Sequence, residues 1–341
     1  MGYDNLKLEK GMYRQEGMSF TQVLESLDPS ENYRGPALEG PDAFQRQLKR
    51  FGILAKGPGS SPVEKFFSTM DSAVLFPEYI ARPVRQGMEE NAILPAITAT
   101  TTIIDAMDYR SIYSNPTDED KELQDVEEGA AIPETEVKTK ENLVSLTKRG
   151  RMLVASYEAI RFQKLDLFGV MLRQIGAHIQ KQQLADAVKV LIDGDGNDNA
   201  AVQYTIGTSP ISGTQGTLAY DQLVEFWGQF DPYTMNTNLC STATMPKLVK
   251  VPELQNPLTG LNFQGTGKLS TPLGAQLHRT SAVADDVIIG LDNRYALELV
   301  RAGDVLVEYD MLIARQLARA AITSISGFGK ICDGAACVLN V

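Results

Sequence analysis

The longest run of regularly spaced apolar residues lies between residues 165 and 192. Its first half carries apolar residues at helical spacing. After the polar run Gln180–Gln183 the apolar positions move to nearly the opposite face. Asp166 can cap the start of such a helix, and Gly194 or Gly196 can end it. We therefore predict one long helix whose two halves pack against different surfaces. The apolar positions are Leu165, Phe168, Leu172, Ile175 and Ile179, followed by Leu184, Ala187, Val188 and Leu191.

A long polar hairpin is predicted just before this helix. Residues 117–128 are dense in acids, residues 134–140 alternate acid, Val, Lys and Thr, and residues 143–155 have strand-like content. A two-stranded hairpin is only marginally stable by itself, and this one has few apolar residues, so we expect another subunit to support it. The candidate intersubunit contacts are its charged residues: Asp118, Glu119, Asp120, Glu127, Glu128, Lys138, Lys140, Lys148, Arg149 and Arg151.

The segment before the hairpin is divided by prolines and glycines. Residues 1–62 are typical of an arm with short helices at 19–27 and 41–54, which lies either on the rest of the protein or on a neighbour. Residues 62–90 have a helical pattern that Pro77 and Pro83 are expected to break or kink. Residues 92–113 are rich in Ile and Thr and favour a strand.

The segment after the long helix resembles a separate α/β unit over residues 220–303. Helices are expected at 220–230 and 246–254, and strands at 238–241, 287–289 and 296–300. Alternation at residues 305–309 and the apolar run 337–341 indicate further strands. Residues 312–325 are ambiguous, because Ile313, Leu317 and Ala321 suit a helix although their neighbours favour strands.

Charge and composition narrow the possible functions. The chain has 341 residues, with 43 acids against 32 basic residues and a formal net charge of −11. That balance argues against tight binding of nucleic acid phosphates, although it allows a nucleic acid to be enclosed. Two histidines are few for imidazole chemistry. Three cysteines in no metal-binding pattern favour reduced, buried thiols. No apolar run is long enough to span a membrane, and the polar N-terminus is no secretory signal.

Two short motifs imitate ligand-binding loops. Residues 193–199, Asp-Gly-Asp-Gly-Asn-Asp-Asn, resemble a calcium loop, but Asp198 and Tyr204 stand where such a loop needs Gly and Glu. We expect a turn that ends the helix. Residues 327–330, Gly-Phe-Gly-Lys, lack the spacing of a phosphate loop and are expected to form a turn. No catalytic residue, cofactor-binding residue or metal ligand is therefore predicted.

The order of elements resembles the major capsid proteins of tailed bacteriophages, which have the Hong Kong 97-type capsid fold. The resemblance covers roughly residues 90–341. It rests on the hairpin and its return strand, on the long helix, on a strand followed by a helix, and on closing strands. These segments are AAIPETEVKTKENLVSLTKRGRMLVASYEAI, LDLFGVMLRQIGAHIQKQQLADAVKVLIDGDG, NLCSTATMPKLVKV, DVLVEYDMLIARQLARAAITSISGFGKI and ACVLNV.

The resemblance implies an α+β protein with an N-terminal arm, an extended β-hairpin loop, a peripheral domain with a long spine helix, and an axial α/β domain. It also implies that residues 312–325 form a strand. The expected segments are the arm (1–62), the start of the peripheral domain (63–116), the hairpin loop and its base (117–156), the spine helix (157–200), the axial domain (201–303) and the closing peripheral strands (304–341).

The resemblance further implies a non-enzymatic virion protein. It would assemble in the host cytoplasm through hexamers and pentamers into an icosahedral shell around double-stranded DNA, without sequence-specific binding. Because the match begins near residue 90, we expect a separate scaffolding protein rather than a cleaved scaffolding segment. A portal and cement proteins are further expected partners. Two alternatives remain: an encapsulin-type nanocompartment shell, and a soluble carboxylate-based enzyme with calcium.

Overall fold

The computed structural model describes residues 3–14, 18–33, 40–90, 92–105, 108–113, 138–255, 274–312 and 316–341. These residues form two compact units. The first unit comprises Met1–Asn91, Lys148–Gln180 and Gly303–Ile325, and the second comprises Ala92–Thr147, Lys181–Ala302 and Ser326–Val341. The chain passes between the units several times, so each unit is assembled from segments that are distant in sequence.

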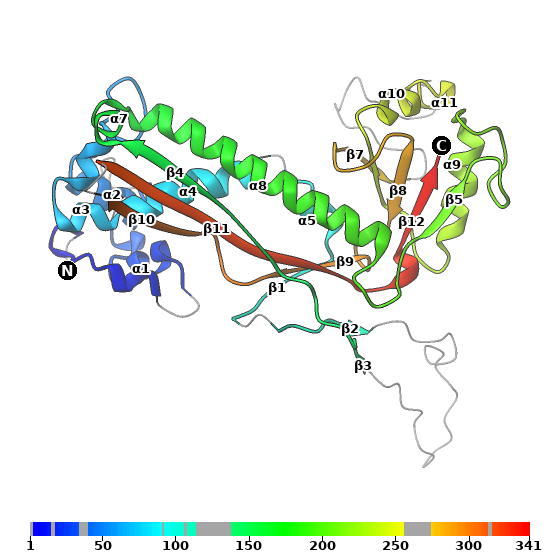
Figure 1. Cartoon of the computed structure of the whole chain (residues 1–341), viewed down its shortest axis with the longest axis horizontal. Helices are drawn as coiled ribbons and strands as arrows, with labels where there is room; N and C mark the ends of the chain where they lie inside the picture. Colours follow the sequence, from blue (N-terminus) through cyan, green and yellow to red (C-terminus); the bar gives the residue numbers. More distant parts are fainter. Residues whose placement is uncertain are drawn as a thin grey trace, which may run out of the picture. The chain divides into compact units, whose positions relative to one another are not determined.

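The described residues begin with helices up to Ile97, continue with strands and helices in mixed order, and end mainly with strands from Gln276 onward (Figure 1). The helices are α1 (Phe20–Leu27), α2 (Ala43–Arg50), α3 (Met70–Val74), α4 (Phe76–Glu89), α5 (Leu94–Ile97), α7 (Tyr157–Phe162), α8 (Leu165–Asp193), α9 (Tyr220–Trp227), α10 (Thr244–Val249) and α11 (Pro252–Gln255). The strands are β1 (Thr100–Ile103), β2 (Ile112–Tyr113), β3 (Lys138–Thr139), β4 (Thr147–Ser156), β5 (Val202–Thr205), β6 (Thr237–Cys240), β7 (Gln276–Arg279), β8 (Val287–Leu291), β9 (Leu297–Arg301), β10 (Leu306–Leu312), β11 (Leu317–Lys330) and β12 (Ala336–Asn340).

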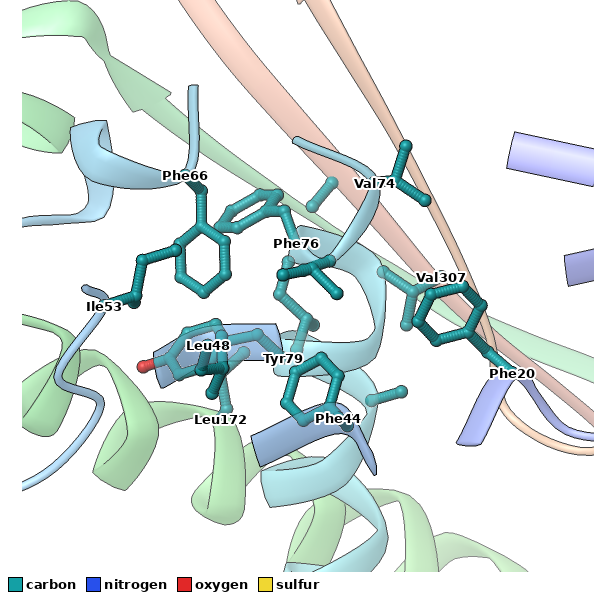
Figure 2. Close-up of a cluster of buried hydrophobic side chains, with 14 of the residues drawn as sticks. Phe20, Phe44, Leu48, Ile53, Phe66, Val74, Phe76, Tyr79, Leu172 and Val307 are labelled. Atoms are coloured by element: carbon teal, nitrogen blue, oxygen red, sulfur yellow. The ribbon is translucent and has the colours of Figure 1, made fainter. Parts of the chain in front are cut away.

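The N-terminal arm packs on its own subunit. Ser19 caps α1 and Asp42 caps α2, each in a reciprocal capping box that satisfies free backbone N–H groups. Both helices direct apolar side chains into the aromatic core of the first unit, which Figure 2 shows around Phe66, Phe76 and Tyr79. The arm therefore lies on the rest of the protein, which is one of the two placements expected for it. The residues that the arm contributes to this core include Leu6, Leu8, Phe20, Leu24, Phe44, Leu48 and Ile53.

The helical pattern breaks just before Pro77, as expected, because α3 ends at Val74 and α4 begins at Phe76. Helix α4 then continues through Pro83, so a break at that proline is wrong. Pro77 lies in the first turn, where a missing N–H costs nothing, and Pro83 lies inside the helix. An interior proline costs about 3 kcal/mol. Burial of the neighbouring side chains Ile80 and Val84, both 0% exposed, offsets this cost.

Helices α4 and α8 approach each other at two glycines. A Cβ on Gly87 of α4 would lie 2.0 Å from the carbonyl oxygen of Arg173 in α8. A Cβ on Gly176 of α8 would lie 2.0 Å from the carbonyl oxygen of Val84 in α4. The two backbones therefore touch directly, and no larger residue fits at either position.

The long helix is confirmed as α8, with two details changed. It begins at Leu165, so Asp166 lies within its first turn rather than at the cap. Leu165, Leu172 and Ile179 belong to the first unit's core, whereas Leu184, Ala187, Val188 and Leu191 belong to a core of the second unit, as the shifted apolar pattern predicted. The polar run between the halves is not solvated throughout, because Gln180 and Gln183 are only 7% and 2% exposed.

Strand β11 decides residues 317–325 of the ambiguous segment in favour of the resemblance, whereas Leu312 ends β10 and residues 313–315 lie outside the described residues. Leu317–Thr323 pair antiparallel with β10 in the first unit, and Ser326–Lys330 pair antiparallel with β9 in the second. Backbone pairing on this scale overrides local helix propensity. Gly327 to Lys330 are thus the end of a strand, and the turn expected there is wrong.

The second unit contains a mixed sheet with the order β5-β12-β8-β6-β7. Strands β12, β8 and β6 are antiparallel neighbours, while β5 and β7 join parallel at the edges. Helix α9 covers this sheet through Leu223 and Phe226, which share a core with Leu339 and Ile288. The region after the long helix has the expected α/β character, but β12, expected among the closing peripheral strands, lies in this sheet. Strand β9, however, pairs with β1 and β11 rather than with this sheet.

Candidate functional site at the base of the hairpin

The two legs of the predicted hairpin pair at their base. Strands β2 and β3 are antiparallel, with Ile112 opposite Thr139 and Tyr113 opposite Lys138 (Figure 1). The pairing continues beyond the two strands. The N–H of Lys140 donates to the carbonyl of Ser111 at 3.0 Å, and the N–H of Val144 donates to the carbonyl of Tyr109 at 2.9 Å. A hairpin is therefore present, but with bounds other than those predicted. Its outgoing leg pairs at residues 112–113, before residue 117, and residues 147–156, expected in the hairpin, form β4, which pairs with β11. The acidic part of the hairpin, residues 114–137, lies outside the described residues.

The outgoing leg is attached to a buried carboxylate. Glu298 of β9 is 6% exposed and accepts three hydroxyl hydrogen bonds. The hydroxyl of Tyr109 donates at 2.7 Å, that of Ser111 at 2.6 Å, and that of Thr102 in β1 at 2.5 Å. A buried carboxylate is costly unless its oxygens are satisfied, so this arrangement specifies where the outgoing leg lies.

The returning leg is attached to a second carboxylate, in the loop that ends α8. The ammonium of Lys140 donates to Oδ2 of Asp195 at 2.8 Å, and both side chains are 2% exposed. The backbone N–H of Lys330, at the end of β11, donates to the same oxygen at 2.9 Å. Lys140 also donates to the carbonyl of Lys330. Three segments that are distant in sequence therefore meet at Asp195.

The rest of the loop extends this attachment. The backbone N–H of Asn142 donates to Oδ1 of Asn197 at 3.0 Å, and the Asn142 amide donates to the carbonyl of Gly196 at 2.7 Å. Nδ2 of Asn197 donates to Oδ1 of Asp195 at 2.9 Å. Gly194 and Gly196 have φ angles of +84° and +92°, which glycine adopts without strain. The motif that resembles a calcium loop thus binds the hairpin of its own chain.

The electrostatics of this loop favour an ionised Asp195. Burial alone would raise the pKa of the carboxyl, but the hydrogen bonds from Lys140, Asn197 and the backbone of Lys330 outweigh burial and lower the pKa below its usual value of 3.8. Burial lowers the pKa of Lys330, whose ammonium donates to the carbonyl of Asn199 at 2.8 Å. Lys140 is therefore the cation directly paired with Asp195.

Two glycines of β11 allow the hairpin base to lie close to that strand. A Cβ on Gly327 would be 2.5 Å from the carbonyl oxygen of Ser145. A Cβ on Gly329 would be 3.3 Å from the Val144 side chain and 3.5 Å from that of Ser111. The Gly-Phe-Gly-Lys motif thus lies directly against the hairpin base. The backbone N–H of its Lys330 donates to Asp195, and the backbone carbonyl of Lys330 accepts from Lys140.

The predicted contact residues fall into separate groups. Asp118, Glu119, Asp120, Glu127 and Glu128 lie outside the described residues, and Lys138 is described only by its backbone in β3. Lys148 and Arg151 of β4 are exposed, and Arg149 is partly buried. Lys140 requires a correction, because its ammonium is buried within the subunit and is not presented to a neighbour.

Sequence reasoning did not find Glu298, Tyr109, Ser111 or Asn142 as site residues. Tyr109 and Ser111 lie nearly 190 positions from Glu298, and only the fold brings them together. The two short motifs were visible signals, but each resembles a ligand-binding loop and neither indicates contact with the other. Spacing along the chain carries no information about their meeting.

Cys240, Cys332 and Cys337 are buried thiols rather than disulfide partners, as expected. Within the described residues, no group of three or more His, Cys, Asp and Glu side chains could hold a metal ion. No helix in the described ranges combines the length and the apolarity that a membrane crossing requires.

Comparison with known proteins finds a likeness in structure but not in sequence. No protein-family model matches the chain, and no curated protein matches it. Among solved structures, the capsid structure of the cyanophage P-SCSP1u is 12% identical with a TM-score of 0.51, over 91% of this chain and 98% of that one. A structure from Microbacterium phage Oxtober96 is 11% identical with a TM-score of 0.50, over 73% of this chain and 91% of that one.

These likenesses define the class of fold. The chain is a mixed helix-and-sheet protein with the Hong Kong 97-type capsid fold. Its structural neighbours are phage-type capsid proteins, in agreement with the resemblance drawn from the sequence. At 12% identity the likeness concerns the fold and does not transfer any residue's role.

Proposed function

We propose that the chain is a major capsid protein that self-assembles through hexamers and pentamers into an icosahedral shell around double-stranded DNA. The observation that carries the proposal is the likeness to a phage capsid structure over 91% of this chain and 98% of the other. The role is structural, and the protein is a component of the virion. A separate scaffolding protein, a portal and cement proteins are its further proposed partners.

Exposed apolar side chains in the first unit support a role in assembly. Met152 and Val154 of β4 are 52% and 54% exposed, and Leu167 of α8 is 65% exposed. Val170 and Met171 in the same half of α8 are also exposed. Large apolar side chains exposed on successive turns of a helix, or along a strand, are typical of surfaces that another protein covers. A shell is held by many such interfaces, each of modest area.

The charges of the hairpin and of β4 suggest how neighbouring copies contact each other. Residues 117–128 are acid-dense, and Lys148 and Arg151 of β4 are exposed. We propose that the acidic hairpin of one copy lies against the basic strand of the next. Such contacts are screened by salt, with a Debye length of about 8 Å at physiological ionic strength, so assembly should weaken as salt rises.

The first experiment is electron microscopy of the purified, expressed protein, with nucleic acid extraction of any particles. Closed shells of megadalton mass support the proposal, and a small discrete particle under all assembly conditions contradicts it. Co-expression with the rest of the virion genes should give DNA-filled shells. Shells that instead fill with a cellular protein cargo would identify a nanocompartment.

The second experiment removes the acidic part of the hairpin. Replacing residues 119–137 with a short Gly-Ser linker spares Lys140 and its pairing with Asp195. The expected result is a folded, soluble subunit that forms no closed shells. A matched control reverses charges instead of deleting residues. Lys148→Glu with Arg151→Glu should block assembly. Adding the reversal of Asp118, Glu119 and Asp120 to lysine in the same chain should restore part of it. Closed shells from the deletion would contradict the role of the hairpin.

A further inference from the structure

The two motifs that imitate ligand-binding loops meet at the hairpin base. Asp195 comes from the calcium-like loop, and Lys330 comes from the phosphate-loop-like run at the end of β11. Lys140, from the hairpin, donates to both: to Oδ2 of Asp195 at 2.8 Å and to the carbonyl of Lys330. We name these three residues, with Glu298, Gly327 and Gly329, the hairpin seat.

We propose that the hairpin seat locks the direction in which the hairpin leaves the subunit before assembly, with Lys140 as the positioning residue and Asp195 as its receptor. The lock is a property of the isolated subunit. Only its consequence for assembly rests on the proposed shell-forming function. The proposal assigns a role to the calcium-like loop: the carboxylate of its Asp195 is paired with an ammonium of the same chain.

The two legs are held by different chemistry. The outgoing leg is held by hydroxyl groups of Tyr109 and Ser111 on the carboxylate of Glu298. The returning leg is held by a buried ion pair, in which Lys140 is 3% exposed. Because the legs also pair with each other, fixing both at their ends leaves the base little freedom to twist or swing.

The glycines make the seat sensitive to small changes. At Gly327 an added Cβ would meet the backbone carbonyl of Ser145 at 2.5 Å, and a backbone atom cannot move aside as a flexible side chain can. The strand and the returning leg are therefore in direct backbone contact. A methyl group at this position would lift the leg off β11 without altering any charge.

The lock has a physical advantage for assembly. Ordering a mobile segment at an interface costs free energy at the moment of binding, and a segment already held in its bound direction avoids part of that cost. A shell repeats the same contact at every subunit, so the saving is repeated as well. Breaking the lock should therefore reduce shell formation more than it disturbs the folded subunit.

The test measures hydrogen exchange at the amides of Lys140 and Val144 in the soluble full-length subunit. These N–H groups donate to Ser111 and Tyr109 across the hairpin base. Lys140→Met removes the ammonium and keeps a linear side chain, and Gly327→Ala disturbs the seat sterically. The control is Lys148→Met, which removes the same charge from an exposed position of β4. Amides of β8 and β12 report on the fold as a whole.

We expect both seat variants to lower protection at Lys140 and Val144 by about tenfold or more, with β8 and β12 unchanged. Lys148→Met should leave all of these amides unchanged. Lys140→Arg, which keeps a cation, should restore part of the protection. Shell yield, counted by electron microscopy, should fall at least about fivefold in Lys140→Met and Gly327→Ala, in keeping with the lost preorganisation.

Each other outcome overturns a defined part of the proposal. Unchanged protection at the hairpin base would show that the seat does not hold the hairpin. If protection were lost throughout the protein in both seat variants, the seat would be a general part of the fold rather than a lock. Lost protection with normal shell yield would refute its role in assembly. If the unaltered protein forms no shells, the proposed function fails, while the exchange measurements still decide whether the lock exists.

Discussion

The aromatic core of the first unit and the hairpin seat of the second unit are stabilised in opposite ways. The core around Phe66, Phe76 and Tyr79 is held by burial and ring packing, with centroid distances from Phe66 of 5.5 and 5.0 Å (Figure 2). The seat is held by two buried carboxylates, one ammonium and glycine contacts. An apolar core loses stability in proportion to the volume removed. A polar seat loses much of its stability when any one partner is missing.

The largest expected effect is in the aromatic core. Phe66 is 0% exposed, so Phe66→Ala should lower the free energy of unfolding by about 4 kcal/mol, because it removes buried area and leaves a cavity. Phe66→Leu should cost less than about 1.5 kcal/mol, since it keeps most of the volume. Met70→Ala, at a side chain 92% exposed, is the control. Chemical denaturation measures all three, and equal losses for Ala and Leu would contradict graded packing.

The next largest effect is expected in the seat. Lys140→Met and Asp195→Leu should each lower the free energy of local opening at the hairpin base by about 3 kcal/mol, because each leaves a buried group without its partner, while β8 and β12 keep their exchange protection. The double variant should cost no more than the worse single variant, since an apolar pair of similar size replaces the ion pair. Simple additivity of the two losses in a double-mutant cycle would show that the two side chains are not coupled.

A third effect concerns the contact of α4 with α8. Gly176→Ala should destabilise the subunit by about 2 kcal/mol despite the higher helix propensity of alanine, because its Cβ would overlap the Val84 carbonyl. Gly169→Ala lies in the same helix, with its nearest neighbour at 3.8 Å, and should be neutral or stabilising by up to about 1 kcal/mol. Thermal unfolding followed by circular dichroism compares them. A stabilising Gly176→Ala would refute the close backbone contact.

The smallest effect in the ordinary pH range is expected from acidification. The pKa of Asp195 in the folded state lies below its usual value of 3.8, so the stabilisation from its ionised form is fully present above that value. It is lost only as pH falls further, through the folded-state pKa. Exchange protection at Lys140 and Val144 should therefore not differ between pH 7 and pH 5, after correction for intrinsic exchange rates, and should fall below about pH 4. Loss of protection already at pH 5 would contradict the direction of the pKa shift.

Much of the fold was predictable from apolar spacing, because burial imposes that spacing directly. The pattern from 165 to 192 predicted one helix with two differently packed halves, and Leu172 and Val188 are indeed buried in different cores. The cap residue Ser19 and the helix-ending Gly194 act locally, so neighbouring residues suffice to predict them. A hairpin was predictable from the polar composition of residues 117–140, but its base was not, because the pairing of residues 112–113 with 138–139 depends on partners that the local pattern does not reveal.

Local rules failed where distant segments decide the outcome. Residues 317–323 favour a helix by themselves and become a strand because β10 pairs with them. Pro83 remains inside α4 because the burial of Ile80 and Val84 outweighs its cost. Lys140 was expected at a neighbouring subunit, yet the fold provides a carboxylate for it within the same chain.

The sequence by itself determined the elements, the order in which they occur and the resemblance to a capsid fold, since those depend on short-range spacing and composition. Only the tertiary structure decided what the two imitation motifs do. Asp195 and Lys330 lie 135 positions apart, and neither loop carries the hairpin residue that joins them. Their meeting depends on strand pairing and on Gly327, which allows β11 to touch the backbone of Ser145, and no local pattern encodes such a contact.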